Sequence, residues 1–252
     1  SIHFKLDDVG RIIKLEWDTV FEDSPTGIGR LERLTMLNCL NWNEELSRLP
    51  YLQTLGYWGY DDSDSSQVDS FPVDMKLDKL KGLNVIFCEF KSSSSLFLTW
   101  MSKQISNLEH LSFNDMEEKS MDIVLDALRD NKFSFQNKLK SLTMNKCSID
   151  GNRFAILLLE ILPGFKKVSS LDLGDNKIES VQLTVDRITK NDHPKTIPKS
   201  LRIVDLNDNP MMKNIKKESK ENTAFMSFLH SFNTISNLGG LKKSDYGPDL
   251  EY

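Results

Sequence analysis

Residues 139–147 read LKSLTMNKC, with apolar residues at the first, fourth and sixth places and a cysteine at the ninth. Side chains alternate between the two faces of an extended strand, so Leu142 and Met144 point to the same face. The same nine-place frame recurs along the chain, and its copies begin at Ile12, Leu31, Leu52, Leu80, Leu108, Leu139, Val168 and Leu201. Apolar residues of one copy are buried only against the next copy. The sequence therefore predicts a stacked array of strands.

The frame matches the L-x-x-L-x-L-x-x-N/C signature, so the chain resembles leucine-rich-repeat proteins from about residue 12 to residue 211. The ninth place holds Cys39, Cys88 and Cys147 in three copies and Asn176 and Asn209 in two others. We expect the asparagine amides to satisfy backbone groups in the turns. The resemblance implies an α/β solenoid, a horseshoe with a parallel concave β-sheet and convex helices or loops. It also implies protein recognition as the usual role.

Copies of two lengths follow one another. The early stretch PTGIGRLERL (25–34) resembles plant-type repeats, whereas the later copies start 28 to 33 residues apart and resemble the ribonuclease-inhibitor type. The phrases SLDLGDNKIESVQ (170–182) and FLHSFNTISNLGG (228–240) resemble leucine-rich-repeat proteins of diatom-type algae. Periodic apolar residues predict helices over the segments 95–105, 120–131, 152–165, 181–188 and 223–232.

A length of 252 residues suits one large domain or two ordinary ones, and the repeats favour a single array. We therefore expect one solenoid over residues 1–252, with an N-terminal cap (1–11), about eight repeats (12–211) and a C-terminal cap and tail (212–252). The net charge of −5 argues against a general nucleic-acid or membrane-surface binder. The apolar run 154–162 is too short to insert into a membrane. SIHFKLDD has no signal-peptide features, no C-x-x-C spacing occurs, and no asparagine lies in an N-x-S/T acceptor. These features favour an intracellular location, cytoplasmic or organellar.

Motifs for catalysis, cofactors and metals are missing from the sequence. Gly27 and Gly29 lack the third glycine of a dinucleotide loop, and the aspartates at 61–64 lack the glycine and glutamate of a calcium loop. The three cysteines could form a disulfide or a metal cluster. We favour the interpretation that they are small, buried hydrophobic residues. We expect no enzyme activity and no cofactor.

Candidate binding residues occupy places three, five, seven and eight, which should face the concave side. The early copies offer apolar and polar groups there, and the late copies offer acidic ones. The candidates are Arg33, Thr35, Leu37, Trp58, Ile86, Phe87, His110, Asp172, Asp175, Asp205 and Asp208. Exposed aromatic residues favour a protein interface, although flanking loops are an equal alternative for burying Trp58, Ile86 and Phe87. The aspartates form either a patch for a basic peptide or cation, or a solvated surface.

Two functions remain open after these exclusions. The first is a non-catalytic scaffold that binds a protein partner on the concave face. The second is a regulator of a partner enzyme, either an inhibitor or a GTPase-activator-like protein. A receptor ectodomain is disfavoured by the cysteine usage.

Overall fold

The structure is a computed structural model, and it describes residues 2–17, 33–39, 46, 48–58, 74–88, 90, 96–130, 133–190, 199–215, 227–228 and 237–239. The chain divides into two compact units, residues 1–135 (unit 1) and 136–252 (unit 2), which are described separately. The prediction of a single solenoid over 1–252 stays a prediction.

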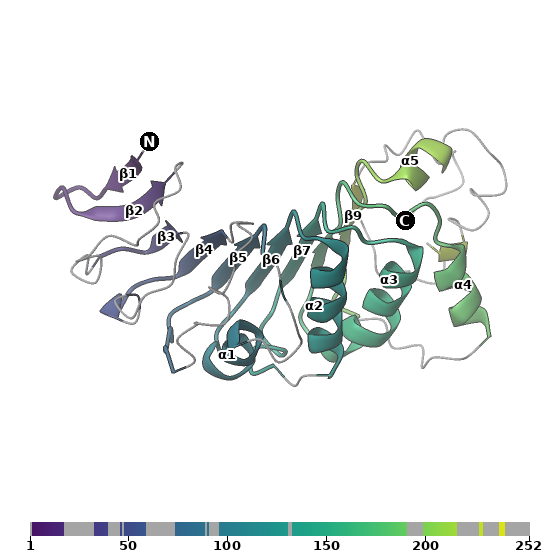
Figure 1. Cartoon of the computed structure of the whole chain (residues 1–252), viewed down its shortest axis with the longest axis horizontal. Coiled ribbons are helices and arrows are strands. Elements are labelled where there is room, and N and C mark those ends of the chain that lie inside the picture. Colours follow the sequence, from purple (N-terminus) through teal and green to yellow (C-terminus); the bar gives the residue numbers. More distant parts are fainter. Residues whose placement is uncertain are drawn as a thin grey trace. The chain divides into compact units, whose positions relative to one another are not determined.

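In the residues that the structure describes, unit 1 is a sheet with its strands in sequence order and two helices (Figure 1). Its elements are β1 (Ile2–Leu6), β2 (Ile12–Trp17), β3 (Met36–Cys39), β4 (Thr54–Trp58), β5 (Gly82–Ile86), α1 (Leu96–Gln104), β6 (His110–Asn114) and α2 (Glu118–Asp130). β1 pairs with β2 in an antiparallel hairpin, and each later strand pairs in parallel with the one before it. The helices α1 and α2 confirm two of the predicted helical segments.

Aromatic side chains fill the core of unit 1. Phe97 on α1 lies 6.1 Å from the ring of Tyr57 on β4 and 5.6 Å from that of Phe90, and it is buried. Trp100 packs beside Phe97, and its indole N–H donates to the carbonyl of Met75 at 2.6 Å. The strand face at places four and six therefore buries large apolar groups, which is the main stabilising contribution expected for a repeat.

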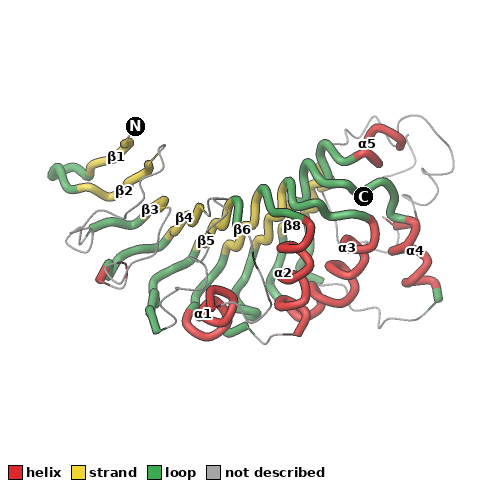
Figure 2. The backbone as a smooth tube through the Cα atoms, viewed as in Figure 1, coloured by secondary structure: helices red, strands yellow, loops and turns green. Residues whose placement is uncertain are grey.

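Unit 2 repeats the same arrangement with shorter strands (Figure 2). Its elements are β7 (Ser141–Asn145), α3 (Gly151–Ile156) continued by a π-helical segment (Leu157–Ile161) and a 3₁₀ turn (Leu162–Gly164), β8 (Ser170–Asp172), α4 (Gln182–Thr189), β9 (Ile203–Asp205), α5 (Pro210–Ile215) and β10 (Asn237–Gly239). β7, β8, β9 and β10 pair in parallel in that order. The strand β10 lies in the segment that the sequence assigned to the C-terminal cap and tail, so the repeat pattern extends further than expected.

The helices of unit 2 begin and end at recognisable signals. Asp150 caps α3 by accepting a hydrogen bond from the backbone N–H of Arg153 at 2.8 Å, and Pro163 lies in the closing 3₁₀ turn. These boundaries confirm the helical prediction for 152–165, and α4 confirms that for 181–188. Of the predicted helix over 223–232, only residues 227 and 228 are described, and they are helical.

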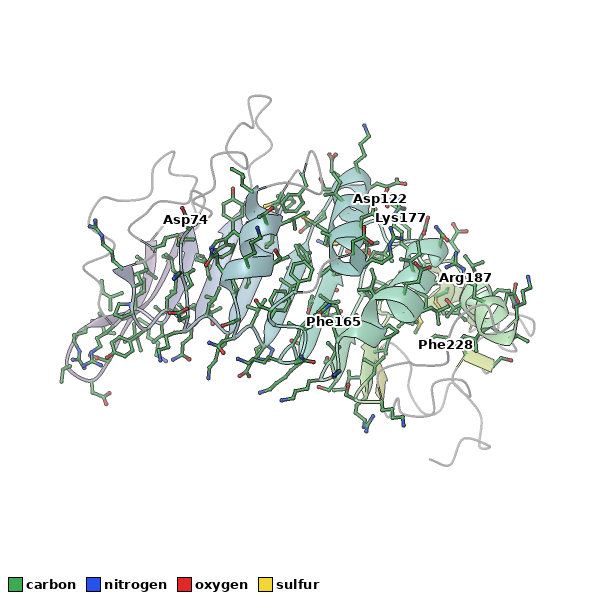
Figure 3. All side chains as sticks on the ribbon, turned by 90° about the horizontal axis from the view of Figure 1, so that it is seen from below. Asp74, Asp122, Phe165, Lys177, Arg187 and Phe228 are labelled. Atoms are coloured by element: carbon green, nitrogen blue, oxygen red, sulfur yellow. The ribbon has the colours of Figure 1, made fainter. Side chains whose placement is uncertain are left out.

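Contacts between helices hold the end of unit 2 together (Figure 3). The guanidinium of Arg187 on α4 donates to the carboxylate of Glu160 at 3.1 Å and to the side-chain oxygen of Asn152 at 3.2 Å. Phe228 is buried, and its ring lies 5.8 Å from that of Phe154. Phe228 is therefore packed against α3.

The asparagines at place nine bond to the backbone as predicted. Asn176 accepts from the N–H groups of Cys147 and Ile149 at 2.9 and 3.0 Å, and it donates to the carbonyls of Met144 and Leu173 at 2.6 and 2.9 Å. Asn209 bonds in the equivalent way one repeat further on. Each amide thus joins its own turn to the turn of the preceding repeat.

Cysteine replaces asparagine at this place in earlier repeats. Cys88 and Cys147 are buried and not joined in a disulfide, which confirms the prediction for these two thiols. The thiol of Cys147 donates to the carbonyl of Asn145 at 3.2 Å. Cys39 of β3 pairs in register with Tyr57 of β4, so it lies at place six and not at place nine as predicted. Its side chain lies outside the described part of the chain.

The frame predicted for the second repeat is wrong by three residues. Leu37 of β3 aligns with Leu55 of β4, and Leu37 is fully buried, whereas Met36 is only partly buried. The repeat therefore begins at Leu34 instead of Leu31. Both frames satisfy the apolar pattern in RLERLTMLNC, and strand pairing decides between them. The assignment of Leu37 to the outward face is corrected accordingly.

Place eight adopts a left-handed backbone conformation in the turn after the strand. Five residues there have φ between 53° and 61°, and none is a glycine: Phe87, Asp115, Lys146, Asp175 and Asp208. Residues with side chains rarely adopt this conformation, because the Cβ approaches the following carbonyl oxygen. The same corner in both units, together with the parallel strands and the buried leucine frame, identifies each unit as a leucine-rich-repeat solenoid.

Candidate protein-binding surface

The sheet face opposite the core carries the side chains at places three, five and seven, and the corner residue at place eight lies at its edge. We call these residues together the outward face. In unit 1 it is mostly small and polar. The side-chain amide of Asn114 on β6 donates to the side-chain oxygen of Asn84 on β5 and to the hydroxyl of Ser112, each at 2.7 Å. These bonds hold the polar side chains of β5 and β6 in fixed positions.

Arg33 and Thr35 lie at the start of β3 and not within its outward row. The Arg33 guanidinium lies 5.2 Å from the centre of the exposed Tyr51 ring. The Thr35 hydroxyl donates to the carbonyl of Ile13 at 2.9 Å, which ties the second repeat to the first. Both placements follow from the shifted frame, which puts Thr35 at place two.

The predicted apolar candidates lie at the end of the strands of unit 1. Ile86 ends β5 and is partly buried, and Phe87 follows it with half of its surface exposed (50%). Trp58 ends β4 and pairs in register with Ile86, but its side chain lies outside the described residues. The structure therefore brings the backbone of Trp58 next to Ile86 and leaves Phe87 accessible.

The acidic candidates of unit 2 lie side by side on neighbouring strands. Asp172 of β8 and Asp205 of β9 are register partners. Their carboxylates also serve the turns: Asp172 accepts from the backbone N–H of Gly174 and the Asn145 amide at 3.1 Å each, and Asp205 accepts from the N–H of Asn207 at 2.9 Å. The turn after each strand therefore holds the carboxylate in place, and Asn145 of the preceding repeat also binds Asp172. Each carboxylate oxygen has two lone pairs, so both groups can still accept hydrogen bonds from a partner.

The remaining candidates are exposed at the edges of the outward face. Asp175 and Asp208 occupy the left-handed corners after β8 and β9, and Lys146 lies 3.9 Å from the Asp175 carboxylate. Both side chains of that pair are more than half exposed, so the pair is weak. His110 begins β6 opposite Gly82 and is also exposed.

Glycines make room for polar side chains on this face, which sequence reasoning missed. A Cβ atom on Gly239 of β10 would collide with the carboxylate of Asp205, and one on Gly56 would collide with the side chain of Asn38. The signal was available for Gly239, because Ile235 and Leu238 are spaced like places one and four of the frame. A ninth copy would have placed Gly239 beside Asp205.

The described part of the chain contains no group of three or more His, Cys, Asp and Glu side chains placed to hold a metal ion. The acidic cluster predicted at 61–64 lies outside the described residues. Among the described helices, none has the length and apolar character needed to cross a membrane.

Comparisons with known proteins find likeness in fold alone. No family model and no curated protein matches the chain. Many solved structures resemble it, among them the following three. They are the leucine-rich repeat-containing protein LegL7 from Legionella pneumophila (19% identity, TM-score 0.47, covering 82% of this chain and 74% of that chain), an internalin (inlF) from Listeria monocytogenes (13%, 0.39, 84% and 62%) and a leucine-rich-repeat protein of Leptospira interrogans (18%, 0.23, 85% and 33%). The fold assignment rests on the repeats and strand pairing of the chain itself.

Proposed function

We propose that this chain is a non-catalytic scaffold that binds a protein partner on its outward sheet face. The observation that carries the proposal is Phe87, a large apolar side chain half exposed at a left-handed corner beside Ile86. Aromatic side chains at such positions dominate the affinity of protein interfaces. On unit 2, the carboxylates of Asp172 and Asp205 offer a separate, charged contact for basic groups.

Capture of a partner by the immobilised chain tests the apolar contact. Phe87→Ala should lower the amount of captured partner by about tenfold, because an interface anchor is lost. Leu183→Ala is the matched control, since Leu183 is a similarly exposed apolar residue (39%) on α4 and lies outside the outward face. Equal capture by the wild type and Phe87→Ala, or equal loss in both variants, would contradict the proposal.

Salt dependence tests the charged contact. The double variant Asp172→Asn with Asp205→Asn can keep the bonds from the backbone N–H groups of Gly174 and Asn207. It gives up the bond that Asp172 accepts from the Asn145 amide and removes two charges. It should slow association with the partner at low ionic strength and have little effect at high ionic strength. Asp74→Asn with Asp78→Asn removes the same charge from exposed positions in unit 1 and serves as the control. If the captured partner is an enzyme, its turnover with and without this chain distinguishes a scaffold from a regulator.

A further inference from the structure

The starts of the strands in unit 2 carry a dense group of cations that the outward-face proposal does not use. Three described segments lead into β7, β8 and β9: residues 136–140, 165–169 and 199–202. They contain six exposed basic residues and no acidic residue. We call these residues the basic edge: Lys138, Lys140, Lys166, Lys167, Lys199 and Arg202.

Backbone hydrogen bonds hold the basic edge in register. The N–H of Ser169 donates to the carbonyl of Lys140 at 2.8 Å, and the N–H of Arg202 donates to the carbonyl of Ser169 at 2.9 Å. Lys140, Ser169 and Arg202 are therefore equivalent residues of three adjacent strands, which lie about 5 Å apart in a sheet.

The buried frame forces these cations outward. Leu139, Val168 and Leu201 at place one are fully buried, so the residues immediately before and after them point away from the core. Phe165 is also fully buried and anchors the segment that presents Lys166 and Lys167 (Figure 3). The Arg202 guanidinium donates to the carbonyl of Lys199 at 2.6 Å, which fixes one more charge.

Unit 1 provides an internal comparison at the same places. The residues that lead into β5 and β6 include Lys79 and Lys81, and they also include the acidic residues Asp78 and Glu109. The charge there is mixed, whereas in unit 2 it has one sign. Neighbouring strands lie about 5 Å apart, which is less than the Debye length of about 8–10 Å, so like charges on neighbouring strands reinforce one another. In a chain whose net charge is −5, this is a local reversal of sign.

We propose that the basic edge of unit 2 binds an acidic segment of a partner protein, with carboxylates of that segment paired to the lysines and Arg202. Three strands span only about 10 Å, the length of a few residues of an extended peptide. The three segments present no exposed aromatic side chain on which nucleic-acid bases stack. Asp172 and Asp205 lie on the same strands about 10 Å further on, where they repel a long nucleic acid or a flat anionic membrane.

Binding of a labelled peptide of alternating glutamate and serine tests the proposal by fluorescence anisotropy at low ionic strength. The wild-type chain should bind it, and added salt should weaken binding. Lys166→Glu with Lys167→Glu should lower the affinity at least about tenfold, and Lys166→Gln with Lys167→Gln should lower it less. Lys79→Glu with Lys81→Glu makes the same charge change in unit 1 and should alter the affinity less than about twofold.

Three results would overturn the proposal: no binding of the peptide by the wild type, equal loss in the unit 1 and unit 2 variants, or tighter binding of labelled oligouridylate or phosphatidylserine vesicles than of the peptide. Circular dichroism of each variant confirms that it is folded. If Lys166→Glu with Lys167→Glu is unfolded, the glutamine variant decides the outcome. The test uses neither Phe87 nor Asp172, so its outcome is independent of the outward-face proposal.

Discussion

Asn176 shows how one residue can hold two repeats together. It is 6% exposed, and its amide makes hydrogen bonds to backbone groups of its own turn and of the turn before it. Buried backbone groups that lose their partners are costly, because water does not replace the lost bonds. The Asn176 side chain therefore stabilises the fold through a buried network of hydrogen bonds to the backbone.

Replacing Asn176 tests this role. Asn176→Ala should lower the free energy of unfolding by about 2–4 kcal/mol, since at least two backbone N–H groups and two carbonyls lose partners. Asn207→Ala removes the same side chain from an exposed position and should cost less than about 0.5 kcal/mol. Urea denaturation of the two variants measures both values. Similar losses at the two positions would refute the network.

At the scale of elements, the β1–β2 hairpin depends on Asp7. Its carboxylate accepts from the backbone N–H groups of Arg11 and Val9 at 2.9 and 3.0 Å and pairs with the Arg11 guanidinium at 2.7 Å. The backbone hydrogen bond from Arg11 is the main cause that lowers the pKa of Asp7 below its ordinary value. The turn also contains Gly10 with φ of 79°, a conformation that glycine adopts easily.

The lowered pKa of Asp7 predicts a pH-dependent hairpin. A carboxyl whose pKa is lower in the folded state stabilises that state above its unfolded pKa of about 4, and the stabilisation is lost as the pH falls through the folded pKa. We therefore expect the amide NMR signals of Val9 and Arg11 to shift as the pH falls below about 4. Asp7→Asn should remove this transition, and Asp8→Asn should leave it unchanged.

Strand phase could be read from the sequence, whereas the details of the outward face could not. Alternation along a strand placed Leu142, Leu171 and Asp172 on their observed sides, because a period of two leaves no other choice. The second repeat was misread because two frames fit the same letters. The turn bonds of Asp172 and the space that Gly239 provides for Asp205 depend on neighbouring strands, which the local pattern does not specify.

At the scale of the whole molecule, charged side chains are not distributed uniformly. Unit 2 has basic residues before its strands and aspartates at the ends of β8 and β9, whereas the charge at the strand starts of unit 1 is mixed. Each unit buries its own apolar frame, and each has one cysteine whose side chain is described as buried, Cys88 in unit 1 and Cys147 in unit 2. These thiols are therefore separate reporters of the packing of the two units.

Thiol labelling in increasing urea uses these reporters. Cys88 and Cys147 should react only as their units unfold, because their side chains are 2% and 0% exposed in the folded state. Peptide mapping by mass spectrometry assigns the label to each cysteine. Rapid labelling of either thiol without urea would contradict the burial of place nine.

The left-handed corner at place eight has a consequence for protein engineering. Phenylalanine, lysine and aspartate all occupy it at nearly the same φ, so the corner forms regardless of the size or charge of its side chain. Glycine would adopt this backbone with less strain. We therefore expect a library randomised at these five corners to retain the strand register. Such a library would vary only the chemistry displayed at the rim, which makes the corner a natural display position for selecting new binders.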